Sequence, residues 1–328
     1  MSAREQASFR VSAGLDEAGY GPLLGPLTIG FAAFRADGPL GWPCLADAVA
    51  EEPARDEDRL VVADSKRVFD RSARGARRLE ATTLSFLRAA GSDARTPDDL
   101  FRTAPETLRV TDAVRRTHPW YGALPDTLPV HVDDEALERH GASLAEALRN
   151  RGAEVVRGGL VVVPAGHLNA SFEATSNKST TLWSYHSAVI AELFDRFGAE
   201  GLDLTCDRLG GRARYGPALA ALLPFATVEP LGEARDESVY LVRAGDGRMR
   251  IRFVQKGDAV SLPTALGSCL AKYAREMVMD AFNDHFSGVC PGVRPTAGYV
   301  TDARRWLAEV ERVRPDVLPA LDGLVRTR

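Results

Sequence analysis

A short loop rich in glycine and proline separates two apolar segments near the start of the chain, and this arrangement restricts the folds available to it. The loop, GYGPLLGP, covers residues 19–26, and the segments at residues 10–16 and 26–34 have strand-like composition. Strands joined by so short a loop run antiparallel, because a parallel pair needs a longer crossover. The chain therefore favours a mixed sheet over a purely parallel one.

Strand-like and helix-like segments follow one another through the rest of the chain. Residues 59–66 are typical of a short buried strand followed by a polar turn, and strand composition returns at residues 154–164 and 202–207. The periodicity of amphipathic helices is found at residues 75–90, 180–198 and 262–282. An Asp-Gly turn at residues 246–247 predicts a hairpin over residues 238–253. We therefore expect an α/β fold with a mixed central β-sheet flanked by helices.

The domain organisation is predicted to be a single domain over residues 1–328. Residues 92–150 are rich in Arg, Asp, Pro and Thr, which indicates an irregular insertion with one or two short helices. Within it, the acidic run at residues 133–135 is interpreted as a solvated helix start. A second insertion is predicted as the hairpin at about 238–254, and a helical region is predicted at about 286–328.

Composition limits the classes of function. The formal net charge is −4 and the pI is about 5.9, so any polyanion must be held by a local patch rather than by a basic protein as a whole. The four cysteines show no CxxC spacing, which is typical of reduced thiols rather than of a zinc site. The first residues lack the apolar core of a secretory signal, and no apolar run is long enough for a membrane span. We expect a cytoplasmic protein with no membrane partner.

Four acidic residues stand where predicted strands end or where a predicted helix is about to begin. Asp16 and Glu17 end the first strand, Asp207 ends the strand at 202–207, and Asp258 precedes the last long helix. Acids at such positions can converge on one edge of a sheet. The alternative for each is an ordinary turn residue beside a glycine.

The adjacent pair poses a geometric problem, because neighbouring residues of a strand point to opposite faces of the sheet. Asp16 and Glu17 are expected to share one site only if the chain leaves strand geometry there. Gly19 and Gly21 would permit that departure.

Clustered carboxylates repel one another, and their pKa values separate unless a cation neutralises them. Mg²⁺ and Mn²⁺ favour oxygen ligands. Two such ions stabilise both the attacking and the leaving oxygen of a phosphoryl displacement. A four-acid site of this kind would need no His, Ser or Cys nucleophile.

Several sequence blocks, in order, resemble motifs of the type 2 ribonuclease H family, which comprises RNases HII and HIII. DEAGYGPLLGP at 16–26 resembles DEAGRGPLAGP, and DSK at 64–66 resembles DSKKL. TCDRLGG at 205–211 places an Asp at a strand end, like the third acid of the family. KGDAVSLPTALGSCLAKYAREMVM at 256–279 resembles the block KADA…AASILAKVTRDRLM, and AGYVT at 297–301 resembles KGYGT. The blocks cover about half the chain.

The resemblance implies an RNase H-like catalytic domain. It further implies a metal-dependent endoribonuclease that uses Mg²⁺ or Mn²⁺ at a two-metal site. The implied substrates are RNA–DNA hybrids or ribonucleotides embedded in duplex DNA, cleaved to 5′-phosphate and 3′-hydroxyl ends. No protein partner is identified.

The motifs also assign residues to roles by position. Asp16, Glu17, Asp207 and Asp258 match the catalytic, metal-binding acids. The residues implied in substrate binding are Gly19, Tyr20, Gly21, Lys66, Lys272 and Tyr299. The Gly-Tyr-Gly segment would contact the ribonucleotide through its backbone, Tyr299 would pack on a sugar, and the two lysines would contact phosphates. Lys272 could alternatively brace Asp258.

The chain departs from the family pattern in two respects. Tyr20 stands where the motif has Arg, and the gaps between the acids are longer than usual, with residues 92–150 and 238–254 filling them. Two other functions therefore stay open. One is a catalytically silent nucleic-acid-binding module of the same fold, and the other is a related nuclease acting on structured DNA such as a flap or junction.

Overall fold

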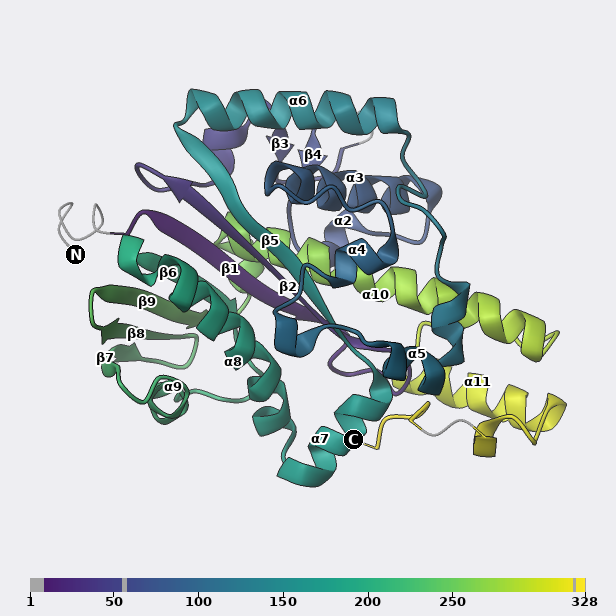
Figure 1. Cartoon of the computed structure of the whole chain (residues 1–328). Coiled ribbons are helices and arrows are strands. Elements are labelled where there is room, and N and C mark those ends of the chain that lie inside the picture. The colour runs from purple at the N-terminus through teal and green to yellow at the C-terminus, as the bar shows by residue number, and fades with distance from the viewer. Residues whose placement is uncertain (1–8, 55–57, 321–322, 328) are drawn as a thin grey trace.

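The computed structural model of the protein describes residues 9–54, 58–320 and 323–327. A seven-stranded sheet with the order β5-β2-β1-β6-β9-β8-β7 lies at the centre of this described part (Figure 1). Its strands are β1 (Val11–Ala18), β2 (Leu27–Ala36), β5 (Ala153–Val163), β6 (Leu202–Asp207), β7 (Thr227–Glu233), β8 (Glu237–Ala244) and β9 (Gly247–Val254). β1 pairs antiparallel with β2 and parallel with β6, so the predicted mixed sheet is confirmed.

Helices cover both faces of the sheet (Figure 1). On one face, α8 (Lys178–Phe197) packs with α7 (Ala165–Thr175) beside it, and on the other face α10 (Leu262–Val289) crosses β1 and β2. Because β2 is covered on both sides, it is apolar at almost every position: Ile29 and Phe31 join the α8 core, and Phe34 joins the α10 core.

The first half of α10 lies directly against the sheet because both surfaces carry glycine. A methyl group on Gly30 would lie 2.0 Å from the carbonyl oxygen of Gly267, and one on Gly14 would lie 2.0 Å from the amide of Thr264. Ser261 caps the helix by accepting a hydrogen bond from the Thr264 amide, as predicted. This close contact fixes the start of α10 beside the ends of β1 and β6.

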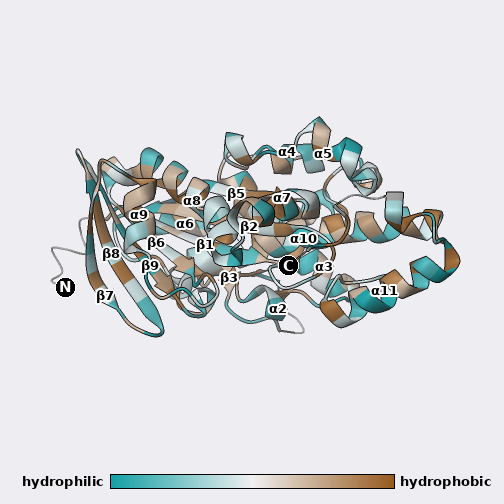
Figure 2. Ribbon diagram, turned by 90° about the horizontal axis from the view of Figure 1, so that it is seen from below, coloured by the Kyte–Doolittle hydropathy of each residue, from teal (hydrophilic) through white to brown (hydrophobic). Residues whose placement is uncertain are grey.

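The remaining elements surround this core. They are β3 (Val49–Ala50), β4 (Leu60–Val61), α2 (Ser65–Val68), α3 (Ala73–Ala89), α4 (Pro97–Phe101), α5 (Asp112–Thr117), α6 (Asp134–Asn150), α9 (Gly216–Leu222) and α11 (Val300–Val313). Seen from below, β7 and β8 lie at one end of the molecule and α11 at the other (Figure 2). None of the helices in the described ranges combines the length and apolar character that crossing a bilayer requires.

Some expectations need correction. In residues 59–66 the expected short buried strand is present as β4, but the helix α2 begins at Ser65 where a polar turn was expected. Residues 92–150 are less irregular than expected, since α6 is a regular helix that packs on α3. Its predicted start is confirmed, because Asp133 caps α6 by accepting from the amide of Ala136. The hairpin at 238–253 is confirmed as β8 and β9, and β9 pairs with β6 inside the central sheet.

Candidate active site

Asp16 and Glu17 both lie within β1, which runs on to Ala18, so the chain keeps strand geometry at this pair, and the departure named as the condition for a shared site does not occur. The two side chains point to opposite faces of the sheet, as strand alternation requires. Asp16 faces α10, where it accepts a hydrogen bond from the hydroxyl of Ser268. Glu17 faces α8, where it meets His186.

Asp16 is buried, with 7% of its surface exposed, and its carboxylate also accepts a hydrogen bond from the Glu17 amide at 2.8 Å. Burial raises the pKa of Asp16 well above its ordinary value, and the charges of Glu17 and Asp207 raise it further. The Ser268 hydroxyl opposes this shift, and its oxygen lies 3.1 Å from that of Ser65 at the start of α2. The carboxylate therefore sits where a cation would relieve crowding of like charges.

His186 is a site residue that the sequence gave no reason to single out. Its Nδ1 lies 3.0 Å from the carbonyl oxygen of Leu182, and its Nε2 lies 3.1 Å from Oε2 of Glu17. A carbonyl oxygen can only accept, so Nδ1 carries a proton and donates it. Nε2 then forms a hydrogen bond with the carboxylate only when a further proton is held between the two groups. The buried imidazole thus fixes the direction of Glu17.

A hydrogen bond from a backbone amide holds Asp207 close to the residue that precedes Asp258. Asp207 ends β6, and its Oδ1 accepts a hydrogen bond from the amide of Gly257 at 2.9 Å. Burial raises the pKa of Asp207 to about 6, the Gly257 amide opposes that shift, and the charges of Glu17 and Asp258 add to it. Asp258 lies in the following short turn, Gly257–Ala259, just before α10.

The pKa of Asp258 is also raised, first by burial and then by the charge of Asp64, whereas Lys66 lowers it. Lys66 is exposed at the start of α2, where Asp64 caps the helix by accepting from its amide. The structure therefore brings the DSK block next to the fourth acid, and it places the Lys66 charge beside the acids.

The four predicted acids act on one another electrostatically, because Glu17, Asp207 and Asp258 all raise the pKa of Asp16. Within the described ranges, however, no three His, Cys, Asp or Glu side chains adopt an arrangement that would hold a metal ion. The physical reason is the orientation of the first pair: Asp16 and Glu17 leave β1 on opposite faces, and Glu17 is bonded to His186. The chemistry of the donor set nevertheless fits Mg²⁺ or Mn²⁺, since all four groups supply carboxylate oxygens and three have raised pKa values.

The loop after β1 is held in a conformation that only glycine adopts readily. Gly19 has φ of 84°, and a methyl group there would lie 2.6 Å from the carbonyl oxygen of Pro26. Gly21 is exposed, and a methyl group there would meet no atom within 4 Å. Burial and then the charge of Glu17 raise the pKa of Tyr20, and the Lys178 ammonium lies 6.0 Å from the centre of its ring. The Gly-Tyr-Gly segment therefore presents open backbone on one side of Tyr20.

The other two predicted substrate residues lie further along α10 and at the start of α11. The Lys272 ammonium bonds to Glu276 and lies 4.8 Å from the centre of the Phe69 ring, so it pairs with Glu276 rather than bracing Asp258. Tyr299 precedes α11, has 51% of its surface exposed, and has the guanidinium of Arg275 at 5.8 Å from its ring centre.

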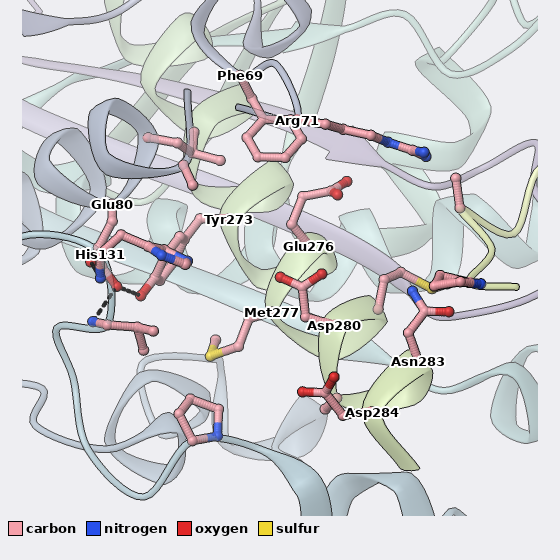
Figure 3. A pocket seen from close by; sticks show the side chains of 18 of the residues that line it. Phe69, Arg71, Glu80, His131, Tyr273, Glu276, Met277, Asp280, Asn283 and Asp284 are labelled. Atoms are coloured by element: carbon pink, nitrogen blue, oxygen red, sulfur yellow. Dashed lines mark hydrogen bonds between the residues drawn. The ribbon is translucent and has the colours of Figure 1, made fainter. Parts of the chain in front are cut away.

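A cavity of about 730 Å³ lies beyond Lys272, on the second half of α10 (Figure 3). The carboxylates of Glu276, Asp280 and Asp284 follow one another along the helix at its mouth (Figure 3). Its wall is held by buried Glu80, which accepts hydrogen bonds from the Tyr273 hydroxyl and from the amides of residues 130–132. None of the four predicted acids lines this cavity, so it is no part of the candidate active site.

No protein-family model matches the chain, and no curated protein matches it. It is similar in structure to type 2 ribonucleases H. One is the RNase HII of Archaeoglobus fulgidus in complex with PCNA, with 16% identity and a TM-score of 0.42 over 97% of this chain and 94% of that one.

Two further structures are similar at the same level. Bst-RNase HIII in complex with Mn²⁺ has 13% identity and a TM-score of 0.41 over 99% of this chain and 68% of that chain. The ribonuclease H2 of Pyrococcus horikoshii OT3 has 14% identity and a TM-score of 0.37 over 95% and 92%. At these values the likeness assigns no activity, substrate or metal to this chain.

Proposed function

We propose that the protein is a metal-dependent endoribonuclease of the RNase H type. It hydrolyses the RNA strand of RNA–DNA hybrids or ribonucleotides embedded in duplex DNA, leaving 5′-phosphate and 3′-hydroxyl ends. The observation that carries the proposal is geometric: β1 and β6 pair in parallel, so Asp16 and Asp207 follow neighbouring positions at the same end of the two strands, and the Gly257 amide bonds Asp207 directly before Asp258. The motif blocks supply the substrate class.

Asp16, Glu17, Asp207 and Asp258 are the residues that would hold Mg²⁺ or Mn²⁺. When bound, the divalent ions supply charge neutralisation at the attacking and leaving oxygens of the phosphodiester. His186 directs Glu17 from the α8 side, and the Gly257 amide directs Asp207. Both contacts hold a carboxylate in place before substrate arrives.

The surrounding residues suit a nucleic-acid backbone. The exposed backbone at Gly21 allows close approach, and a protein distinguishes RNA from DNA through the 2′-hydroxyl. Lys66 supplies a positive charge beside Asp258, where a phosphate would lie, and the exposed ring of Tyr299 offers a flat surface for a sugar. This local arrangement suits the net negative charge of the chain, because the patch is confined to the site.

The second candidate, a nuclease for structured DNA, is favoured by one feature. Tyr20 stands where the family motif has an Arg, so the loop carries a phenol and no guanidinium at this position. If 2′-hydroxyl recognition needs that Arg, the same acids would cleave a different substrate.

A cleavage assay tests both candidates. Three duplexes are compared with Mg²⁺ or Mn²⁺: one with a single ribonucleotide, one continuous RNA–DNA hybrid, and one of DNA only. We expect cleavage of the first two and none of the third, and we expect Asp16→Asn to be inactive. Equal cleavage of all three duplexes, or cleavage of a DNA flap alone, would refute the ribonuclease proposal.

Asp284→Asn is the matched control for that assay. It neutralises an exposed carboxylate that lines the cavity on α10, whereas a change at Glu276 would also remove the ion-pair partner of Lys272. Its activity should equal that of the wild type, and activity retained in Asp16→Asn would overturn the assigned site.

A further inference from the structure

The loop between β1 and β2 forms hydrogen bonds with a segment that lies about three hundred positions further along the sequence. Val325 forms an antiparallel bridge with Leu24, and the amide of Arg326 donates to the carbonyl of Leu23 at 2.9 Å. Asn169 of α7 fixes the same segment, because its side chain donates to the Val325 carbonyl at 2.8 Å. Residues 323–327 are called the clasp below, and they end beside α7 (Figure 1).

The Arg326 side chain forms three hydrogen bonds with the loop. It is 3% exposed and passes under the loop, where Nε and Nη2 donate to the carbonyl of Gly25 at 3.0 and 2.7 Å. Its Nη1 donates to the carbonyl of Gly19, the residue held at positive φ. One guanidinium thus ties together both ends of the loop that contains Tyr20 and Gly21.

A second buried guanidinium, Arg275 of α10, supports the same loop. It is 1% exposed, and it donates to the carbonyl of Pro26 at 2.8 Å and to that of Ala297 at 3.0 Å. Since Ala297 lies just before Tyr299, Arg275 joins the loop to the predicted sugar-binding tyrosine.

Both guanidinium groups are positively charged and buried, which is uncommon without a carboxylate partner. Neither forms an ion pair with a carboxylate in the ranges that the structure describes, and Glu276 acts on Arg275 only from a longer distance. Burial and then the charge of Arg275 lower the pKa of Arg326 to about 9. Burying an unpaired charge is unfavourable, and a neutral side chain would avoid it. What the charges provide instead is charge-assisted hydrogen bonds to carbonyls, which are stronger than neutral ones.

We propose that Arg326, assisted by Arg275, is a positioning residue that holds residues 19–26 in the conformation that admits a ribonucleotide, with the clasp as its support. This inference rests on the proposed function. A loop with both ends fixed keeps the backbone at Gly21 in one place, and such rigidity is needed if backbone atoms are to recognise a 2′-hydroxyl. Without Arg326, the loop would keep its bonds to Arg275 and to the Gly298 carbonyl, but the carbonyls of Gly19 and Gly25 would lose the bonds that hold them to one guanidinium.

Hydrogen exchange of the full, metal-free chain tests the clasp without relying on activity. We expect Arg326→Met to speed exchange at the amides of residues 19–25 by about tenfold or more, the loss expected for charged hydrogen bonds. Arg326→Lys, which keeps the charge but loses the fork, should lie in between. Arg314→Met is the control, because Arg314 bonds to Asp316 away from the loop.

Two outcomes of the exchange experiment would overturn the inference. One is unchanged exchange at residues 19–25 in Arg326→Met. The other is exchange that rises equally in β1, β2 and β6, since that would indicate loss of the whole fold rather than of the loop. If Arg326→Met does not fold, Arg326→Lys and Arg275→Lys provide the same comparison.

Binding by Asp16→Asn, with and without Arg326→Met, tests the role in recognition. Fluorescence anisotropy with Mg²⁺ compares a duplex bearing one ribonucleotide with the same duplex in DNA. We expect Arg326→Met to weaken binding of the first by about tenfold and to leave the second within twofold, because the loop reads the 2′-hydroxyl. Equal loss for both duplexes, or no loss for either, contradicts the positioning role.

The two proposals fail in different ways. If the wild type cleaves no ribonucleotide substrate, the proposed function fails, whatever the exchange rates are. If the wild type cleaves such substrates while Arg326→Met keeps loop protection and selectivity, only the clasp inference fails.

Discussion

Two groups of carboxylates lie along α10, and their differences are informative. At the start of the helix, Asp258 meets Asp16 and Asp207 at the edge of the sheet. Along its second half, Glu276, Asp280 and Asp284 border the cavity of Figure 3. Burial and neighbouring charges raise the pKa of Asp207 to about 6 in the first group and that of Asp280 to about 6 in the second. A raised pKa therefore does not distinguish a site from a crowded helix face.

The backbone around each group does distinguish them. The first group is drawn from three separate segments, and Asp207 is fixed by the Gly257 amide. The helix α10, which follows Asp258, packs closely against the sheet at Gly267, and this contact fixes the positions of the three segments relative to one another. The members of the second group share one face of a single helix and face solvent or the cavity. Preorganisation of the first group is what a hydrolytic site requires.

The comparison is tested most severely by neutralising one acid in each group. Asp16→Asn removes a candidate metal ligand, and we expect cleavage of a ribonucleotide-containing duplex to fall by about 10³-fold or more. Asp280→Asn should leave the rate within about twofold. Steady-state rates with Mg²⁺ measure both. Similar losses of activity in the two variants would show that the acids at the end of β1 and those that border the cavity do not have separate roles.

Glycine substitutions at the two ends of α10 test the structural half of the comparison. A methyl group on Gly267 would lie 2.7 Å from the Gly30 carbonyl oxygen, whereas one on Gly288 would meet nothing within 4 Å. We expect Gly267→Ala to lower the free energy of unfolding by about 2–3 kcal/mol because the backbones must move apart. Gly288→Ala should raise it by about 0.5 kcal/mol through helix propensity. Urea denaturation measures both, and equal effects would mean that the start of α10 is not tightly packed on the sheet.

His186 extends the comparison, because its ring lies 3.1 Å from Glu17, whereas His131 lines the cavity and acts on Asp280 only through its charge. His186→Ala frees Glu17, and we expect kcat/KM to fall by about 10- to 100-fold, the usual effect of losing a group that orients a metal ligand. His186→Gln, which can still donate to Glu17, should recover part of the loss. The metal concentration for half-maximal activity should rise in His186→Ala, and an unchanged value would argue against an orienting role. His285→Gln on α10 is the control.

Much of the fold could be predicted from local sequence patterns. The β1–β2 hairpin, β5, β6, α8 and α10 follow from apolar periodicity and from the loop composition between them. The extent of α6 was missed because its apolar positions, Leu137, Leu144 and Leu148, are few among charged residues. Strand end positions and motif order together indicated the four acids.

The rest of the site depends on contacts between residues that are remote in sequence. His186 meets Glu17 across 169 positions, and Arg326 meets Gly19 across 307. Neither side chain carries a local signature: a histidine on an apolar helix face has the same pattern as a core residue. The orientation of Asp16 and Glu17 was left conditional on where the first strand ends, because local glycine content shows where a strand can end and not where it does.

The smallest expected effect concerns stability at the cavity. Although the Asp280 side chain is exposed, partial desolvation of its carboxylate raises its pKa in the folded protein, and the charges of Glu276 and Asp284 raise it further. The folded-state pKa is about 6, whereas the ordinary value is 3.8. A raised carboxyl pKa means that the ionised form is disfavoured in the fold. Asp280 therefore lowers stability above about pH 6, and this penalty disappears as the pH falls below about 4.

Asp280→Asn should accordingly stabilise the protein at pH 8 by less than about 0.5 kcal/mol, since Asp280 is exposed and solvent screens its charge. The difference from the wild type should vanish at pH 4. Thermal unfolding at both pH values measures it, with Asp246→Asn in the β8–β9 turn as the control for an isolated exposed carboxylate. If Asp280→Asn is still more stable than the wild type at pH 4, the effect comes from packing rather than from charge. The raised pKa would then no longer be a property that the two groups of acids share.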